Sequence, residues 1–453
     1  MDYPIWDLAM GGGVLMGLVA VTHVIVSHFA IGGGLVIAVT ETLSVKNHDR
    51  EMRELAKRSS LMLILVSTVF GAISGVGIWV VAGLISPFAI SALIRNYVWA
   101  WAIEWVFFFV EIVAALVYYA TWDKISKKAH VMVAWVYFIA AYLSLVVING
   151  IVSFMLTPGE WLTTHAFWDG FFNPTYFPSL VLRTGIVMLM AAAFMVWPAL
   201  KAGTEARPRL MRYLGWWMFA GVLVSYAGYR WWEAALPETI RALFLGDSPA
   251  LLGLADTRHF LLWAITLVLV MTVIFLLVRP KAARAIPLLL LTLAAFGFFG
   301  GYERLREGTR KPFLIHDYMF SNGVRVDQVA KLGEEGFLST ARWASAAATE
   351  PGVVTGRQIF RAQCASCHTL GGYLAITDYL PEDPDMIYSV VYTLYDQAEA
   401  YAALAPGEPV DKAALDYPFM PPFVGTEEEM EALVEYLATL VVPAETVAQK
   451  GGI

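Results

Sequence analysis

The chain has 453 residues, of which 58% are hydrophobic and only 15% charged, and this composition excludes a single soluble domain. Its charges are segregated: residues 330–453 contain 6 Lys and Arg against 18 Asp and Glu, a net charge of −12, whereas the whole chain carries −7, so residues 1–329 carry +5. The split predicts a membrane domain followed by an acidic soluble domain, and nothing in it indicates a nucleic-acid partner.

Eight apolar segments are long enough to cross a bilayer, which predicts an all-α, polytopic membrane bundle of about eight helices. No cleavable signal peptide is expected, because residues 1–6 lack basic side chains. The predicted spans are Val14–Leu43, Leu61–Leu93, Tyr97–Trp122, Val131–Leu156, Phe177–Leu200, Tyr213–Trp231, Phe260–Val278 and Ile286–Tyr302.

Basic residues concentrate in alternate loops. The stretch Lys46–Arg58 holds five Lys and Arg, and further groups follow the third, fifth and seventh spans. The loop Thr157–Tyr176 on the opposite side has none. By the positive-inside rule the N-terminus lies outside, and eight spans return the chain to the outside.

Two histidines lie in the first span. A neutral imidazole is a usual ligand of haem iron, so His23 and His28 are candidate ligands. Their five-residue offset places them on different faces of the helix. Either one could instead be hydrogen-bonded to a neighbouring helix.

Two carboxyl groups lie in the third span. Glu104 and Glu111 are seven residues apart and therefore share one face of an apolar helix. Because a charge inside the bilayer is costly, such a stripe suits a proton path or the surroundings of a haem. The alternative is a carboxyl group paired with an arginine elsewhere.

Four further ionisable residues lie near the outer ends of spans. Glu303 and Glu307 share a helix face at the end of the last span, where a charged helix end at the membrane surface is the plainer interpretation. Arg183 could hold haem propionates, pair with a carboxylate or snorkel to the surface. His259, at the mouth of the seventh span, is a weaker candidate ligand.

The membrane half resembles subunit I of the cytochrome bd oxidases over roughly residues 10–320. The resemblance is strongest in four segments, which are Val21–Glu41, Ala102–Asp123, Val147–Pro158 and Gly301–Phe313.

This resemblance implies roles for individual residues. The family's first-span haem ligand falls on His23, and the glutamates of its oxygen-side proton path fall on Glu104 and Glu111. Its Glu-Tyr-Gly-Arg-Gln-Pro-Trp segment is similar to residues 307–313, which places its haem b-ligating carboxylate on Glu307 and its motif arginine on Arg310.

The chain also departs from the family pattern. The fifth-span histidine that ligates the low-spin haem b aligns near Arg183, and its methionine partner falls near Phe260. The loop that binds quinol in the family is only about Trp232–Arg258 here, and a ninth span is missing. The quinol-side haem and quinol site are therefore expected to be lost or rebuilt, so that one to three haem b or haem d groups would remain.

The soluble part carries the run Cys364-Ala365-Ser366-Cys367-His368, the C-x-x-C-H signature of c-type haem attachment. Two thiols bind one porphyrin covalently, and the adjacent histidine becomes an axial ligand. Met420, in a loop held extended by prolines, is the predicted second ligand. A zinc half-site is the alternative, but His368 is the only histidine after His316, and zinc would need two more ligands.

These features predict a membrane bundle over residues 1–312, a linker over 313–349 and a periplasmic cytochrome c domain over 350–453. Helices are expected at Gly356–Cys367, Met386–Ala403 and Met430–Leu440, the last capped by Thr426 and Glu429.

Three functions are compatible with these features. The first is a terminal oxidase of a bacterial inner membrane that takes electrons through its own haem c, from a soluble cytochrome c or another redox protein, and reduces O2. The second is a quinol-oxidising conduit that passes electrons outward without reducing O2. The third is a non-catalytic haem-bearing scaffold. A second bd-type subunit or a homodimer is the expected assembly.

Overall fold

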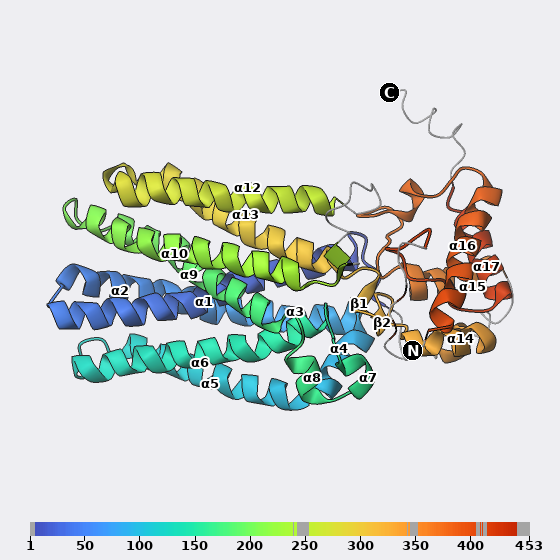
Figure 1. Cartoon of the computed structure of the whole chain (residues 1–453), viewed down its shortest axis with the longest axis horizontal. Helices are drawn as coiled ribbons and strands as arrows, with labels where there is room; N and C mark the ends of the chain where they lie inside the picture. Colours follow the sequence, from blue (N-terminus) through green and yellow to red (C-terminus); the bar gives the residue numbers. More distant parts are fainter. Residues whose placement is uncertain are drawn as a thin grey trace, which may run out of the picture.

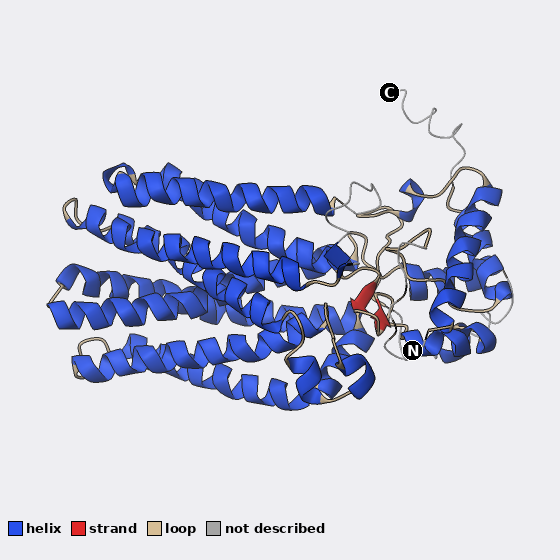
Figure 2. Ribbon diagram, in the orientation of Figure 1, coloured by secondary structure: helices blue, strands red, loops and turns tan. Residues whose placement is uncertain are grey.

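The computed structural model describes residues 5–238, 240–241, 253–341, 343–344, 352–404, 408, 410 and 415–441. Long helices run side by side along the molecule, and a smaller helical domain covers one end of them (Figures 1 and 2). Residues 242–252 of the predicted short outer loop lie outside the described part, and so does residue 350, the predicted start of the cytochrome c domain.

The membrane region is built from long helical segments, joined by short ones. The long segments are α1 (Gly12–Asn47), α2 (Arg50–Ile64) continuing through a π-helical stretch η1 (Leu65–Gly71) into α3 (Ala72–Ile85), α5 (Val98–Ala120), α6 (Lys127–Phe154), α9 (Tyr176–Leu200), α10 (Ala206–Ala235), α12 (Leu254–Met271) with η3 (Thr272–Val278), and α13 (Ala285–Thr309). The short ones are α4 (Pro87–Asn96), α7 (Trp161–Thr164), α8 (Phe167–Phe171) and η4 (Pro280–Ala282).

Within the described residues, seven helices are long and apolar enough to cross a membrane. The eighth predicted span coincides with α10, which is 30 residues long and packs along α9 but is not among the seven. The all-α bundle is therefore confirmed with seven candidate membrane helices, and the eighth span stays a prediction.

The second predicted span is wrong in its limits. The helix begins at Arg50, where the Asp49 side chain accepts hydrogen bonds from the backbone N–H groups of Glu51 and Met52. It ends at Ile85 rather than Leu93, because Pro87 opens the separate helix α4.

The basic loops lie together at one end of the bundle. The α1–α2, α5–α6, α9–α10 and α12–α13 connections all lie at the end far from the C-terminal domain (Figure 1). The alternation of loop charge along the sequence thus becomes a charged end of the molecule, as a positive-inside arrangement requires.

Glycines allow α9 to pack closely against its neighbours at the centre of the bundle. A Cβ atom on Gly185 would lie 2.2 Å from the backbone nitrogen of Ser225 in α10. On α1, a Cβ atom on Gly32 would lie 1.9 Å from the carbonyl oxygen of Val187. Small residues at these contacts are the usual device for close helix packing in membranes.

The remaining elements connect the bundle to the C-terminal domain and build that domain. They are β1 (Phe313–Ile315), β2 (Met319–Phe320), η5 (Val326–Gln328), α14 (Val329–Glu335), η6 (Leu338–Thr340), α15 (Val353–Ile359), η8 (Phe360–Cys364), η9 (Ile376–Asp378), α16 (Pro384–Ala402) and α17 (Glu427–Ala438).

The predicted linker contains the antiparallel hairpin β1–β2, which packs into the C-terminal domain. Phe313 and Phe320 share one buried cluster with Tyr401 of α16 and with Val424. The Phe320 and Tyr401 rings meet edge to face, with centroids 5.0 Å apart. The hairpin also joins the bundle, because Ile315 and Met319 share a second buried cluster with Leu93 and Tyr97.

The helices predicted for the soluble domain are confirmed within a few residues. The first continues from α15 through η8 to Cys364, the second is α16, and the third is α17. At α17, Thr426 and Glu429 form the predicted capping box.

Candidate haem sites and polar network

The C-x-x-C-H run forms a tight turn at the end of η8. The backbone N–H of His368 donates to the carbonyl oxygen of Cys364 (2.9 Å), and both thiols are free and half-buried. His368 Nδ1 donates to the carbonyl oxygen of Leu374 (3.1 Å), so Nε2 remains available for iron. Burial also lowers the pKa of His368, which favours the neutral, ligating form. These residues fit haem c.

The Met420 loop is held against α16. The Tyr417 N–H donates to the side-chain oxygen of Gln397 (2.8 Å), and the Phe423 N–H donates to the carbonyl oxygen of Leu394 (2.9 Å). Met420 itself is half-buried between these two anchors. This support is what a second axial ligand needs to hold its position.

His23 lies half-buried on α1, facing α3. Its Nδ1 is hydrogen-bonded to Ser74 Oγ (3.2 Å), and its ring passes beside Gly75, where a Cβ atom would lie 3.2 Å from Cε1. One nitrogen is thus oriented by a hydrogen bond while Nε2 is left for iron, and the donor type fits a haem ligand.

His28, one turn deeper, belongs to a buried ionic cluster. Its Nδ1 is bonded to the carbonyl oxygen of Val24 (2.8 Å), and its Nε2 lies 3.4 Å from Nη1 of Arg183. Both ring nitrogens therefore have protein partners, and the geometry favours His23 over His28 as an iron ligand.

The cluster is centred on an ion pair between α9 and α13. Arg183 Nη2 donates to Glu303 Oε1 (3.0 Å), and Arg306 Nε donates to Glu303 Oε2 (3.0 Å). Arg183 and Glu303 are only 5% and 8% exposed. Of the alternatives for Arg183, the structure therefore shows pairing with a carboxylate.

The residues at this place do not fit a low-spin haem b with a histidine and a methionine ligand. The guanidinium of Arg183 is no iron ligand, and it is already engaged by Glu303. Phe260 packs on α13, where a Cβ atom on Gly297 would lie 3.2 Å from its ring. His259 is exposed on the second turn of α12.

Glu307 and Arg310 lie at the outer end of α13. Arg310 Nη2 donates to both carboxylate oxygens of Glu307, and Arg310 is 3% exposed whereas the Glu307 side chain is 44% exposed. Among the described residues, Arg310 Nε and Arg306 Nη1 are buried and have no hydrogen-bond partner. An accessible carboxylate beside buried, unsatisfied guanidinium nitrogens fits an iron ligand next to propionate groups.

Glu104 and Glu111 both face α6. Ser144 Oγ donates to Glu104 Oε1 (2.8 Å), and Tyr137 Oη donates to Glu111 Oε1 (3.2 Å). Neither carboxyl group is paired with an arginine of the described part of the chain, which favours a proton path over an ion pair.

A second polar cluster consists of Glu41, Tyr118 and His130, none of which stands out in the sequence. Glu41 is 0% exposed and contacts His130 Nδ1 (2.7 Å) and Tyr118 Oη (2.8 Å). The signal that could have found them is the repeat of polar residues every seven positions along α5 and α6.

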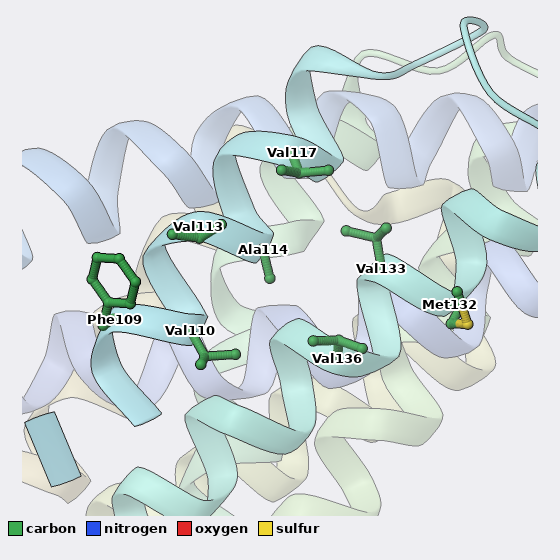
Figure 3. Close-up of a pocket in the computed structure, with 8 residues that line it drawn as sticks. All are labelled: Phe109, Val110, Val113, Ala114, Val117, Met132, Val133 and Val136. Atoms are coloured by element: carbon green, nitrogen blue, oxygen red, sulfur yellow. The ribbon is translucent and has the colours of Figure 1, made fainter. Parts of the chain in front are cut away.

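A groove of about 280 Å³ opens between α5 and α6 (Figure 3). Its walls are entirely apolar, so it suits a lipid chain. The residues that line it are Phe109, Val110, Val113, Ala114, Val117, Met132, Val133 and Val136.

Comparisons with known proteins agree with this geometry. Residues 14–227 match the family model of cytochrome bd terminal oxidase subunit I, and residues 353–441 match that of cytochrome c. The solved bd oxidase of Geobacillus thermodenitrificans has the same fold, with a TM-score of 0.60 and 15% identity, over 67% of this chain and 87% of that one. No curated protein matches the chain. The chain is therefore a membrane haem electron-transfer protein that joins a cytochrome bd subunit I-like domain to a C-terminal cytochrome c domain.

Proposed function

We propose that this protein is a terminal oxidase that accepts electrons from a soluble cytochrome c, or a similar redox protein, through its C-terminal domain and reduces O2 in its membrane region. The basic loops would face the cytoplasm and the cytochrome c domain the periplasm of a bacterial inner membrane. Bound haem would supply the electron transfer and the oxygen chemistry, while the residues of the chain hold the haem groups and deliver protons.

One contact carries the proposal. The loop that follows His368 rests on the segment that leads into α1, so closely that a Cβ atom on Gly372 would lie 1.9 Å from the carbonyl oxygen of Ala9. That segment is fixed to α3 by the bond from the Trp6 N–H to the carbonyl oxygen of Leu84 (3.0 Å). His23 lies on α1, about 17 Å along the helix axis from the start of α1 at a rise of 1.5 Å per residue.

The acidic surface of the domain supports a basic protein donor. Residues 330–453 carry a net charge of −12, whereas residues 1–329 carry +5, and opposite charges steer protein partners toward each other in a salt-dependent way. The Arg183–Glu303 pair also supports a protein donor over quinol, since Arg183 aligns near the position where the bd family holds a ligand of its quinol-side haem.

The membrane face of the bundle supports association with a second membrane subunit. Aromatic side chains of α5 stand on its outer surface, with Trp99 at 73% and Trp105 at 63% exposure. A homodimer or a related partner would cover part of this face, and lipid would cover the rest.

Difference spectra with CO, combined with a pyridine haemochrome assay, test the proposal. A high-spin haem that binds CO, present beside haem c, is expected. Only low-spin haems, with no response to CO and with reduction of haem c by quinol, would indicate the electron conduit instead. Absence of any membrane haem would favour the scaffold.

A matched pair of variants tests whether electrons pass from haem c to the membrane haem through the contact between Gly372 and Ala9. Gly372→Ala must displace the haem loop from Ala9, and is expected to slow electron transfer from haem c to the membrane haem. Gly371→Ala is the control, because a Cβ atom there meets nothing within 4 Å among the described residues. Equal rates in the two variants would contradict a route through this contact.

A further inference from the structure

The polar residues between α5 and α6 form a regular series of three contacts across the antiparallel pair. On each helix they recur every seven residues, so each series follows one helix face. The contacts, from the outer to the basic end, are Glu104 with Ser144, Glu111 with Tyr137, and Tyr118 with His130.

The contact at the basic end includes a carboxyl group of α1. His130 Nδ1 lies 2.7 Å from Glu41 Oε1, and His130 Nε2 lies 2.9 Å from the carbonyl oxygen of Tyr118. The hydroxyl of Tyr118 donates to Glu41 Oε2 (2.8 Å). Glu41 and His130 are 0% and 2% exposed.

Counting donors and acceptors shows that this pair holds one transferable proton. The carbonyl oxygen of Tyr118 only accepts, so Nε2 must carry a hydrogen. The bond between Nδ1 and Oε1 then needs one more proton, which resides either on His130 or on Glu41. Both arrangements satisfy every hydrogen bond, so the proton moves within the pair at little cost, whereas its loss would break the bond.

The pair is close to the basic surface. The rings of Trp122 and His130 are 4.3 Å apart, and Arg53 and Lys57 of α2 lie over the Trp122 ring. Both cations also contact the exposed carboxylate of Asp123 (2.8 and 3.2 Å). These are the charged groups that lie between Glu41 and the basic loops.

The distance to the next contact suits a short chain of water. Seven residues correspond to about 10 Å along a helix, too far for one hydrogen bond. The positions at this level on the same helix faces are Ala38, Ala115 and Ala134, all buried. These small side chains belong to the hydrophobic core, and a water chain between the two polar contacts would have to pass beside them.

We propose that Glu41 and His130 form a proton-loading site at the basic end of the bundle, which delivers protons to Glu111 and then Glu104. For each proton that leaves Glu41 toward Glu111, one is taken up at His130 from the basic side, and no other atom or electron is exchanged. That these protons are used to reduce O2 rests on the proposed function, whereas the existence of the loading site does not.

Glu41→Gln and His130→Gln test the site in the full-length, haem-loaded protein. Glu41→Gln keeps the shape and can keep the bond to Tyr118, but cannot transfer a proton. It is expected to slow O2 uptake on the order of 10²-fold, the usual size of a proton-transfer contribution, while reduction of haem c by its donor stays unchanged. Thr40→Val is the control, because Thr40 is equally buried in the same turn but is bonded to Tyr213 of α10.

Two readouts separate proton loading from a structural role. Infrared difference spectra between oxidised and reduced protein should contain a carboxyl signal that disappears in Glu41→Gln and persists in Thr40→Val. If Glu41→Gln does not fold, Tyr118→Phe, which removes a single hydroxyl, should shift that signal.

The proposal is overturned if Glu41→Gln is folded, turns over within twofold of the unaltered protein and leaves the infrared signal intact. If the unaltered protein consumes no O2, the infrared test still decides the loading site, and only the proposed oxidase activity fails.

Discussion

The buried pair between Arg183 and Glu303 gives a prediction whose size follows from the structure. Removing one partner of a buried ion pair costs about 3–5 kcal/mol, because the other charge is left buried. In Arg183→Met, Glu303 would keep its bond to Arg306, so the lower limit of about 3 kcal/mol applies. At about 2 °C per kcal/mol for a large chain, the unfolding midpoint should fall by roughly 6 °C.

The assay is thermal unfolding of the purified protein in detergent, followed by circular dichroism. The matched control is Arg209→Met, which removes the contact between Arg209 and Asp49 at the basic end, where the Arg209 side chain is 55% exposed. An exposed pair contributes about 0–1 kcal/mol, so this midpoint should move little. If Arg183→Met were as stable as Arg209→Met, the ionic cluster would not stabilise the bundle as argued.

Three further predictions concern the haem ligands. Replacing Cys364 or Cys367 by Ala should weaken or abolish covalent haem, measured by haem staining after denaturing electrophoresis; unchanged staining would contradict the attachment. Met420→Ala should keep the covalent haem but lower its midpoint potential in a redox titration, because a thioether ligand raises the potential, and an unaltered potential would exclude Met420 as a ligand. His23→Ala should remove the CO-binding band while leaving haem c intact, whereas Ser74→Ala should only weaken it, since Ser74 orients the ring; a full CO response in His23→Ala would assign the ligand elsewhere.

Much of the fold could be predicted from residues that lie close together in the sequence. The C-x-x-C-H run and the helices of its domain were predictable because covalent attachment and helix capping depend on residues a few positions apart. The membrane helices were predictable from apolar length, except where Pro87 ended one span early and where α10 carried more charge than a typical span.

The polar clusters were less predictable because they join distant parts of the chain. Arg183 and Glu303 are 120 positions apart, and no periodicity in either helix shows that they meet. Glu41 and His130 are 89 positions apart, and nothing in the sequence around either residue indicates that they meet. Which helix faces meet is decided by the packing of α1, α5 and α6, which depends on small residues rather than on the polar ones.

Oxygen uptake by the purified, haem-loaded protein, with reduced soluble cytochrome c as the sole electron donor, tests the central claim most directly. The account predicts steady O2 consumption that stops when CO is added and falls at high salt, since the acidic domain binds a basic donor. No O2 consumption, together with reduction of haem c by a quinol, would contradict the oxidase and would establish an electron conduit in its place.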